Sequence, residues 1–199
     1  MPDTGGELGL PPLFRIGEFE GSVNEYVEAL HWQYRAMLDH ADLRLWGKPV
    51  TASGRPAADG RDARFWHLIT AKSQPQTEET RCLNLKRCAH LPRVWHLLEL
   101  LATSDVRAVW WREGPYLFVA PADFSMVIVL LETRGSFQLR AAFPTDKRKK
   151  TTRLFNRAAR AWADGPCAHP TPSHRKWADG CPWIDRLSAR QTLIMRAQV

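Results

Sequence analysis

The chain has 199 residues and a formal net charge of +7, with a sequence pI of about 9.6. Its 44% hydrophobic and 25% charged content is ordinary for a globular protein, and its length suits one domain with extensions. No apolar run approaches the ~20 residues that cross a bilayer, and the acidic N-terminus lacks a signal peptide. We therefore expect a cytoplasmic protein without a membrane partner, and the excess positive charge favours a polyanion as ligand.

The first part of the chain predicts helices around a single strand. Residues 1–17 predict no regular structure, whereas residues 22–38 predict a helix because Ser22 and Glu25 form a capping box. Residues 46–64 predict a turn-rich loop and residues 64–70 predict a strand. Two helices are expected next, over residues 80–89 and 93–103, with Pro92 opening the second.

The remainder predicts a run of strands and a last helix. Apolar segments at 106–111, 116–119, 126–131 and 137–143 predict four strands, and residues 151–163 predict an amphipathic basic helix. This order of elements suits an α+β fold in which helices flank a small antiparallel sheet.

Basic residues concentrate where the strands end. Between Arg140 and Arg160 there are eight basic residues and one acid. Arg134 and Arg140 flank the last predicted strand, and an arginine can fork across two phosphate oxygens and stabilise developing charge. Arg134 could equally be a solvated hairpin arginine or form a surface pair with Glu132. The run Lys147–Lys150 could bind an RNA backbone or simply increase solubility.

His67 is the candidate acid or base, because imidazole titrates near neutral pH. A strand over 64–70 would place it on one face with Phe65 and Ile69. The alternative is a structural histidine whose hydrogen bonds are satisfied by its neighbours. Trp66, Trp110 and Trp111 could stack on bases, although packing in the core is the more common use of tryptophan.

Two groups of side chains could bind zinc, and one short pattern of an arginine and a histidine has a known counterpart in a protein family. Two thiolates and two imidazoles in the tail suit tetrahedral zinc, but their spacing is not a standard one and we expect no metal or cofactor. Arg35 and His40 fit the Arg-x4-His pattern of HEPN ribonucleases, whose all-helical context this chain lacks. The tail residues are Cys167, His169, His174 and Cys181, and a weaker set is Cys82, Cys88 and His90.

Taken in order, several segments resemble the barnase–EndoU–colicin–RelE-like (BECR) endoribonucleases, in particular phage and mobile-element members often found as toxins. The likeness covers roughly residues 60–162. It is carried by the Arg-Phe-Trp-His-Leu-Ile-Thr segment at 64–70, by Arg81 and Cys82 with the helix after them, by Trp110 and Trp111, and by the segment 139–144 before the basic stretch.

The resemblance implies a BECR/RelE-like fold and metal-independent RNA cleavage by 2′-OH attack, which leaves a 2′,3′-cyclic phosphate. His67 matches the histidine of the family, and Arg134 with the stretch Lys147–Lys149 matches its charge-stabilising residues. Ala141 stands where the family usually has a hydroxyl residue, and Phe143 replaces what is often tyrosine. If either hydroxyl is catalytic, this member is expected either to have weakened activity or to rely on His67 and the lysines.

These observations together predict a cytoplasmic endoribonuclease toxin from a toxin–antitoxin or phage-defence setting, with RNA, on or off the ribosome, and an antitoxin or immunity protein as partners. The expected parts are a helical extension with a loop at 1–59, a BECR-like ribonuclease domain at 60–163 and an irregular tail at 164–199. The predicted catalytic residues are His67, Arg134, Lys147 and Lys149, and the predicted substrate-binding residues are Arg81, Arg140, Arg148, Lys150 and Arg153.

Two alternatives stay open. A non-catalytic nucleic-acid-binding protein could use the same basic helix, and production of cyclic-phosphate ends would distinguish it from a nuclease. A protein–protein adaptor or inhibitor in phage–host conflict is the second alternative. The absence of RNA affinity even at low salt would favour that one.

Overall fold

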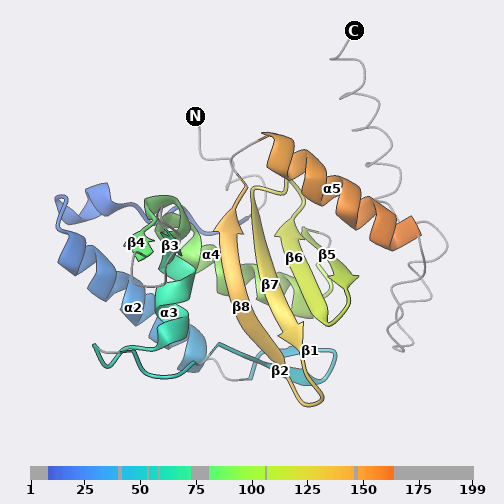
Figure 1. The fold of residues 1–199 in the computed structure, drawn as a ribbon, viewed down its shortest axis with the longest axis horizontal. Coiled ribbons are helices and arrows are strands. Elements are labelled where there is room, and N and C mark those ends of the chain that lie inside the picture. Colours follow the sequence, from blue (N-terminus) through green and yellow to red (C-terminus); the bar gives the residue numbers. More distant parts are fainter. Residues whose placement is uncertain are drawn as a thin grey trace, which may run out of the picture. The chain divides into compact units, whose positions relative to one another are not determined.

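The structure is a computed structural model that describes residues 9–39, 42–52, 54–57, 59–72, 81–105, 107–145 and 148–163. The chain divides into two compact units after Ala161, and nearly all described residues belong to the first. In this unit, helices flank a curled six-stranded sheet (Figure 1). The prediction of a mixed α+β fold is therefore confirmed.

The N-terminal elements are a short 3-10 helix, η1 (Ile16–Phe19), and the long helix α2 (Val23–Asp39). The helix predicted at 22–38 is confirmed, and Ser22 Oγ accepts a hydrogen bond from the Glu25 N–H at 3.4 Å. This bond satisfies a donor that a helix start otherwise leaves unpaired. The buried side of α2 includes Tyr26, Leu30 and Tyr34, which anchor it in the core.

The strand predicted at 64–70 is wrong, because the chain forms helix α3 (Ala63–Ile69) there. Asp62 caps this helix, and its Oδ1 accepts from the Arg64 N–H at 2.6 Å. Phe65, Leu68 and Ile69 are buried at helical spacing, a pattern that bulky strand-favouring side chains obscure in the sequence. The strand β3 (Thr70–Lys72) follows and pairs antiparallel with β4 (Arg81–Leu83).

Two helices were expected after this hairpin, but the structure has one, α4 (Leu85–Ala102), with Pro92 inside it. A proline in a helix interior removes a hydrogen bond and costs ~3 kcal/mol. Around Pro92 the side chains of Leu91, Val94 and Leu98 are buried, and we infer that their packing offsets this cost. None of the helices in the described ranges is long and apolar enough to cross a membrane.

The six-stranded sheet has the order β1-β2-β8-β7-β6-β5. The four predicted strands are confirmed as β5 (Ala108–Glu113), β6 (Tyr116–Pro121), β7 (Met126–Glu132) and β8 (Phe137–Pro144), each antiparallel to the next. The sheet is not purely antiparallel, because β2 (Lys48–Thr51) pairs parallel with β8. The loop predicted at 46–64 therefore contains β2, which forms a short hairpin with β1 (Arg44–Leu45).

Each face of the sheet packs against a different helix. The face toward α4 buries apolar side chains such as Leu117, Ile128 and Leu139 in the main core. The other face carries Trp111 and Phe118 and receives α5 (Arg148–Ala163), the basic helix predicted at 151–163. Figure 1 shows α4 behind the sheet and α5 near its upper end on the viewer's side.

Candidate anion-binding site

A bulge in β8 sets the position of Arg140. Val129 pairs with Ala141 whereas Leu130 pairs with Leu139, so Arg140 is the extra residue on β8. Leu139 and Ala142 on either side of the bulge are buried toward α4, and Arg140 is exposed. The bulge therefore turns Arg140 and Ala141 away from the main core. Bulges of this kind commonly redirect a side chain next to a functional site.

Arg64, in the first turn of α3, meets this bulge. Its Nη1 donates to the backbone carbonyl of Arg140 at 3.1 Å, and its Nε is buried without a hydrogen-bond partner among the described residues. Burial, and then the charge of Arg140, lower the pKa of Arg64, although a guanidinium stays protonated at neutral pH. Two cations are thus close together at the bulge, an arrangement that suits an anion.

The segment before α3 holds Arg64 in place. Asp62 accepts from two backbone N–H groups, through Oδ1 from Arg64 and through Oδ2 from Gly54, each at 2.6 Å. A Cβ added to Gly54 would lie 2.6 Å from Asp62 Oδ1, so this approach requires glycine. Tyr34 donates to the Ala52 carbonyl at 2.6 Å, and burial and then Asp62 raise the pKa of that phenol. The Asp62 carboxylate is therefore committed to the helix cap and its loop.

His67 follows Arg64 by three residues in α3, a spacing that places two side chains on the same flank of a helix. It is half-buried, and its backbone carbonyl accepts from Arg87 Nη1 at 3.2 Å. The expected grouping of His67 with Phe65 and Ile69 on one face is wrong, because those two residues belong to the core. The helix instead places His67 on the same flank as Arg64.

Arg134 lies at the other end of β8, in the turn after β7, and it is exposed. The turn is braced by hydrogen bonds in which Thr133 Oγ1 accepts from the Ser136 N–H at 3.0 Å and donates to the Ser136 carbonyl at 2.9 Å. Arg140 is three residues beyond the start of β8, or about 10 Å at ~3.3 Å per residue. The structure therefore groups Arg140 with Arg64, and separates Arg134 from them.

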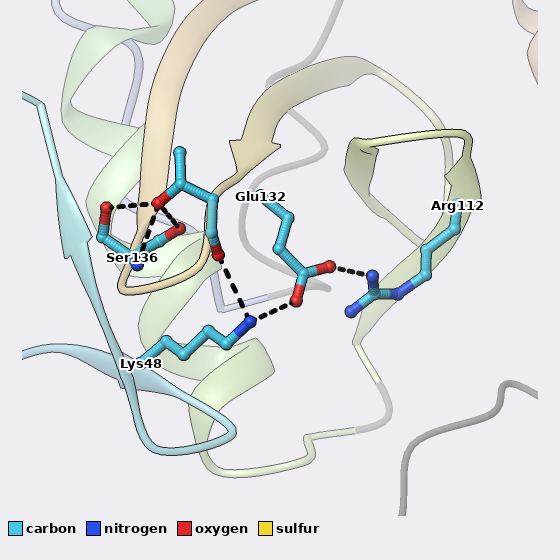
Figure 2. Close-up of polar contacts among 5 residues, drawn as sticks. Lys48, Arg112, Glu132 and Ser136 are labelled. Atoms are coloured by element: carbon cyan, nitrogen blue, oxygen red, sulfur yellow. Dashed lines mark hydrogen bonds and ion pairs between the residues drawn. The ribbon is translucent and has the colours of Figure 1, made fainter.

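Glu132 pairs with Lys48 and Arg112 rather than with Arg134, so the alternative of a Glu132–Arg134 surface pair is wrong (Figure 2). Lys48 Nζ lies 2.7 Å from Glu132 Oε1 and also donates to the Thr133 carbonyl at 3.3 Å. Burial alone would raise the pKa of Glu132, but the hydrogen bonds from Lys48 and Arg112 outweigh it and hold that pKa below its ordinary value. These contacts join β2, β5 and β7.

The structure describes the side chains of only some of the other predicted basic residues. Arg153 is exposed on α5, whereas Lys147 lies outside the described residues. The structure describes the backbone but not the side chains of four further predicted residues, namely Arg81 in β4 and Arg148, Lys149 and Lys150 in α5. Arg157 forms an ion pair with Glu113, and its guanidinium lies 5.3 Å from the ring centre of Phe118. We therefore assign Arg157 to the packing of α5 on the sheet.

The described residues also limit the zinc and stacking alternatives. Cys88 is fully buried, and burial raises the pKa of its thiol to about 12, whereas Cys82 is exposed. In the described ranges, no three His, Cys, Asp or Glu side chains gather as a metal site. Trp111 is 1% exposed and stacks on Phe118, so it is a core residue. The tail set of cysteines and histidines, and His40 of the Arg-x4-His pattern, lie outside the described residues.

Sequence reasoning missed Arg64 as a functional residue. The signal was its three-residue spacing from His67, which has meaning only once residues 63–69 are recognised as a helix. No protein-family model matches this chain, and neither curated proteins nor solved structures give a match. The function of the site is therefore inferred from its own geometry.

Proposed function

We propose that this chain is an endoribonuclease with a BECR-like domain, which cleaves RNA by attack of the 2′-OH on the adjacent phosphate. The observation that carries the proposal is the contact of the Arg64 side chain with the Arg140 carbonyl at the bulge of β8. His67 follows Arg64 by one turn of α3. The helix α4 after Arg81 and Cys82 and the antiparallel strands β5 to β8 support the proposal, whereas the segment at 64–70, a strand in the resembling family, is helix α3 here. A toxin role in the cytoplasm, with an antitoxin as partner, belongs to the same proposal.

In this mechanism Arg64 and Arg140 bind the scissile phosphate. The 2′-oxygen forms a bond to phosphorus, the bond from phosphorus to the 5′-oxygen breaks, and the products are a 2′,3′-cyclic phosphate and a 5′-hydroxyl. Negative charge builds up on the phosphate oxygens in the transition state, and the two permanent cations stabilise it. His67 takes the proton of the 2′-OH or donates one to the leaving oxygen, because an imidazole can serve as base or acid near neutral pH. Lys147 and Lys149 keep the charge-stabilising role that the resemblance implies for them.

The test is incubation of the purified chain with total RNA in EDTA, followed by mapping of the RNA ends. We expect His67→Ala and Arg140→Ala each to lower cleavage by ~10²-fold or more. Arg140→Ala keeps the backbone carbonyl that Arg64 contacts, so it removes charge without breaking the tie between α3 and β8. Arg15→Ala, at an exposed arginine before η1, is the matched control and should change little.

Thermal melting of each variant establishes that the fold survives. Full activity in folded His67→Ala would remove this histidine from the mechanism, and an absolute need for added magnesium would contradict the proposed chemistry. Arg134→Ala is expected to weaken RNA binding more than the chemical step, because Arg134 lies apart from the Arg64–Arg140 pair.

Ala141 supports a second candidate function, RNA binding without cleavage. It occupies the bulge beside Arg140, where the resembling family usually carries a hydroxyl group. A protein that binds 2′-O-methyl RNA but leaves unmodified RNA intact would favour this candidate. A chain without RNA affinity even at low salt would instead favour the adaptor or inhibitor alternative.

A further inference from the structure

Part of the sheet face that α5 shares is open. Tyr116, Leu131 and Gln138 pair directly across β6, β7 and β8 and form one row, which we call the Tyr116 row. Tyr116 is 41% exposed, and Leu131 and Gln138 are partly exposed. By contrast Trp111, on the same face, is 1% exposed. The row is thus an accessible strip with one aromatic, one apolar and one polar side chain.

Cationic groups border this strip on two sides. Arg134 stands in the turn that follows Leu131, and Arg140 at the bulge two residues after Gln138, and both are exposed. The acid that pairs with Tyr116 across β5 and β6 is Glu113, and its charge is compensated by Arg157. The surroundings of the strip are therefore positive, which complements a phosphate backbone.

We propose that the Tyr116 row binds single-stranded RNA, with a base stacked on the ring of Tyr116 and the neighbouring phosphates held by Arg140 and Arg134. This inference rests on the proposed function for the position of the scissile phosphate at Arg64 and Arg140. Tyr116 and Gln138 are two strands apart, or about 10 Å at ~4.8 Å per strand, a distance that a dinucleotide can span. A duplex does not fit this role, because its bases already stack on one another.

The test measures, by fluorescence anisotropy, the affinity of the chain for a labelled 2′-O-methyl oligoadenylate. This oligonucleotide lacks the attacking 2′-hydroxyl, so its affinity is measured without cleavage. Tyr116→Ala should lower affinity about tenfold, the reduction typical of one base–aromatic stack, whereas Tyr116→Phe should keep it. Tyr116→Leu keeps an apolar side chain but removes the ring, and it serves if the alanine variant folds poorly. Trp32→Ala is the matched control, because Trp32 is 68% exposed on α2.

Two further measurements separate stacking from charge. An abasic oligonucleotide of the same length should bind the wild type about as weakly as the adenylate binds Tyr116→Ala. The slope of log affinity against log salt should be unchanged in Tyr116→Ala. It should be smaller by ~0.7 in Arg140→Ala, because one cation no longer neutralises a phosphate there.

Unchanged affinity in both Tyr116→Ala and Tyr116→Leu, or equal binding of the abasic and adenylate strands, would overturn the inference. Tighter binding of a duplex than of the single strand would also overturn it. These outcomes differ from a failure of the proposed function. A wild type that leaves total RNA intact, yet binds the adenylate in a Tyr116-dependent way, would refute the nuclease and support the Tyr116 row.

Discussion

Replacing Glu132 by glutamine should destabilise the fold, because this carboxylate joins three strands through two cations. Lys48 reaches it from β2 and Arg112 from β5, while Glu132 itself ends β7. Glutamine has nearly the same shape and keeps one acceptor oxygen, but it carries no charge. Lys48 and Arg112 would then lie close together without the anion between them, and the ion pair that ties the β1–β2 hairpin to β7 would lose its negative charge.

The exposure of the three side chains sets the size of the effect. Glu132 is 19% exposed, Arg112 is 30% exposed and Lys48 is 34% exposed. Breaking a fully buried pair costs ~3–5 kcal/mol, whereas exposed pairs contribute ~0.2–1 kcal/mol. After discounting for solvent screening at Lys48, we expect a destabilisation of ~2 kcal/mol. A domain of this size loses ~2–4 °C in Tm per kcal/mol, so Tm should fall by ~4–8 °C.

The assay is thermal and urea unfolding of wild type and Glu132→Gln over a range of pH. The folded-state pKa of Glu132 is lowered by its partners, so the stability it contributes is present above its unfolded pKa of ~4.3. This contribution is lost as pH falls through the lower folded pKa. The difference in Tm should therefore be full at neutral pH and should shrink below about pH 4.

Glu99→Gln is the matched control, because Glu99 is 49% exposed and its carboxylate lies 3.7 Å from His96 Nδ1. It should leave Tm nearly unchanged. Equal stability of Glu132→Gln and wild type at neutral pH would refute the reasoning. A destabilisation that did not vary with pH would show that shape, and not charge, holds the hairpin. A double variant with Lys48→Met should be less destabilised than the sum of the two single variants, since the cation and anion depend on each other.

Two further predictions concern thiol reactivity and the basic run. Iodoacetamide at mildly alkaline pH should alkylate exposed Cys82 and spare Cys88 until the protein unfolds, because burial raises the pKa of the Cys88 thiol to about 12. Early modification of Cys88, detected by peptide mass mapping, would contradict the packing of α4. Replacing Lys147, Arg148, Lys149 and Lys150 together by alanine should weaken RNA binding and lower the slope of log affinity against log salt by ~0.7–0.9 for each phosphate that is no longer neutralised. An unchanged slope would exclude this run from contact with nucleic acid.

The sequence by itself determined the elements whose periodicity is local. The helix α2 was predicted because Ser22 and the apolar side chains after it form a cap and a helical stripe within a few turns. The strands β5 to β8 were predicted because each is a short apolar run bounded by turn residues. The same evidence placed Arg134 in a turn and Arg140 in a strand.

Only the tertiary structure decided the features that depend on distant contacts. The segment at 64–70 has the composition of a strand, but burial of Phe65, Leu68 and Ile69 against the core selects the helix. The parallel pairing of β2 with β8 joins Val50 to Phe137, residues far apart in the chain, and no local pattern encodes it. The candidate site has the same origin. The Arg64 side chain reaches the Arg140 carbonyl because a helix cap at Asp62 holds the start of α3 and a bulge between Val129 and Leu130 sets the position of Arg140. Contacts of this kind are set by the packed fold rather than by neighbouring residues.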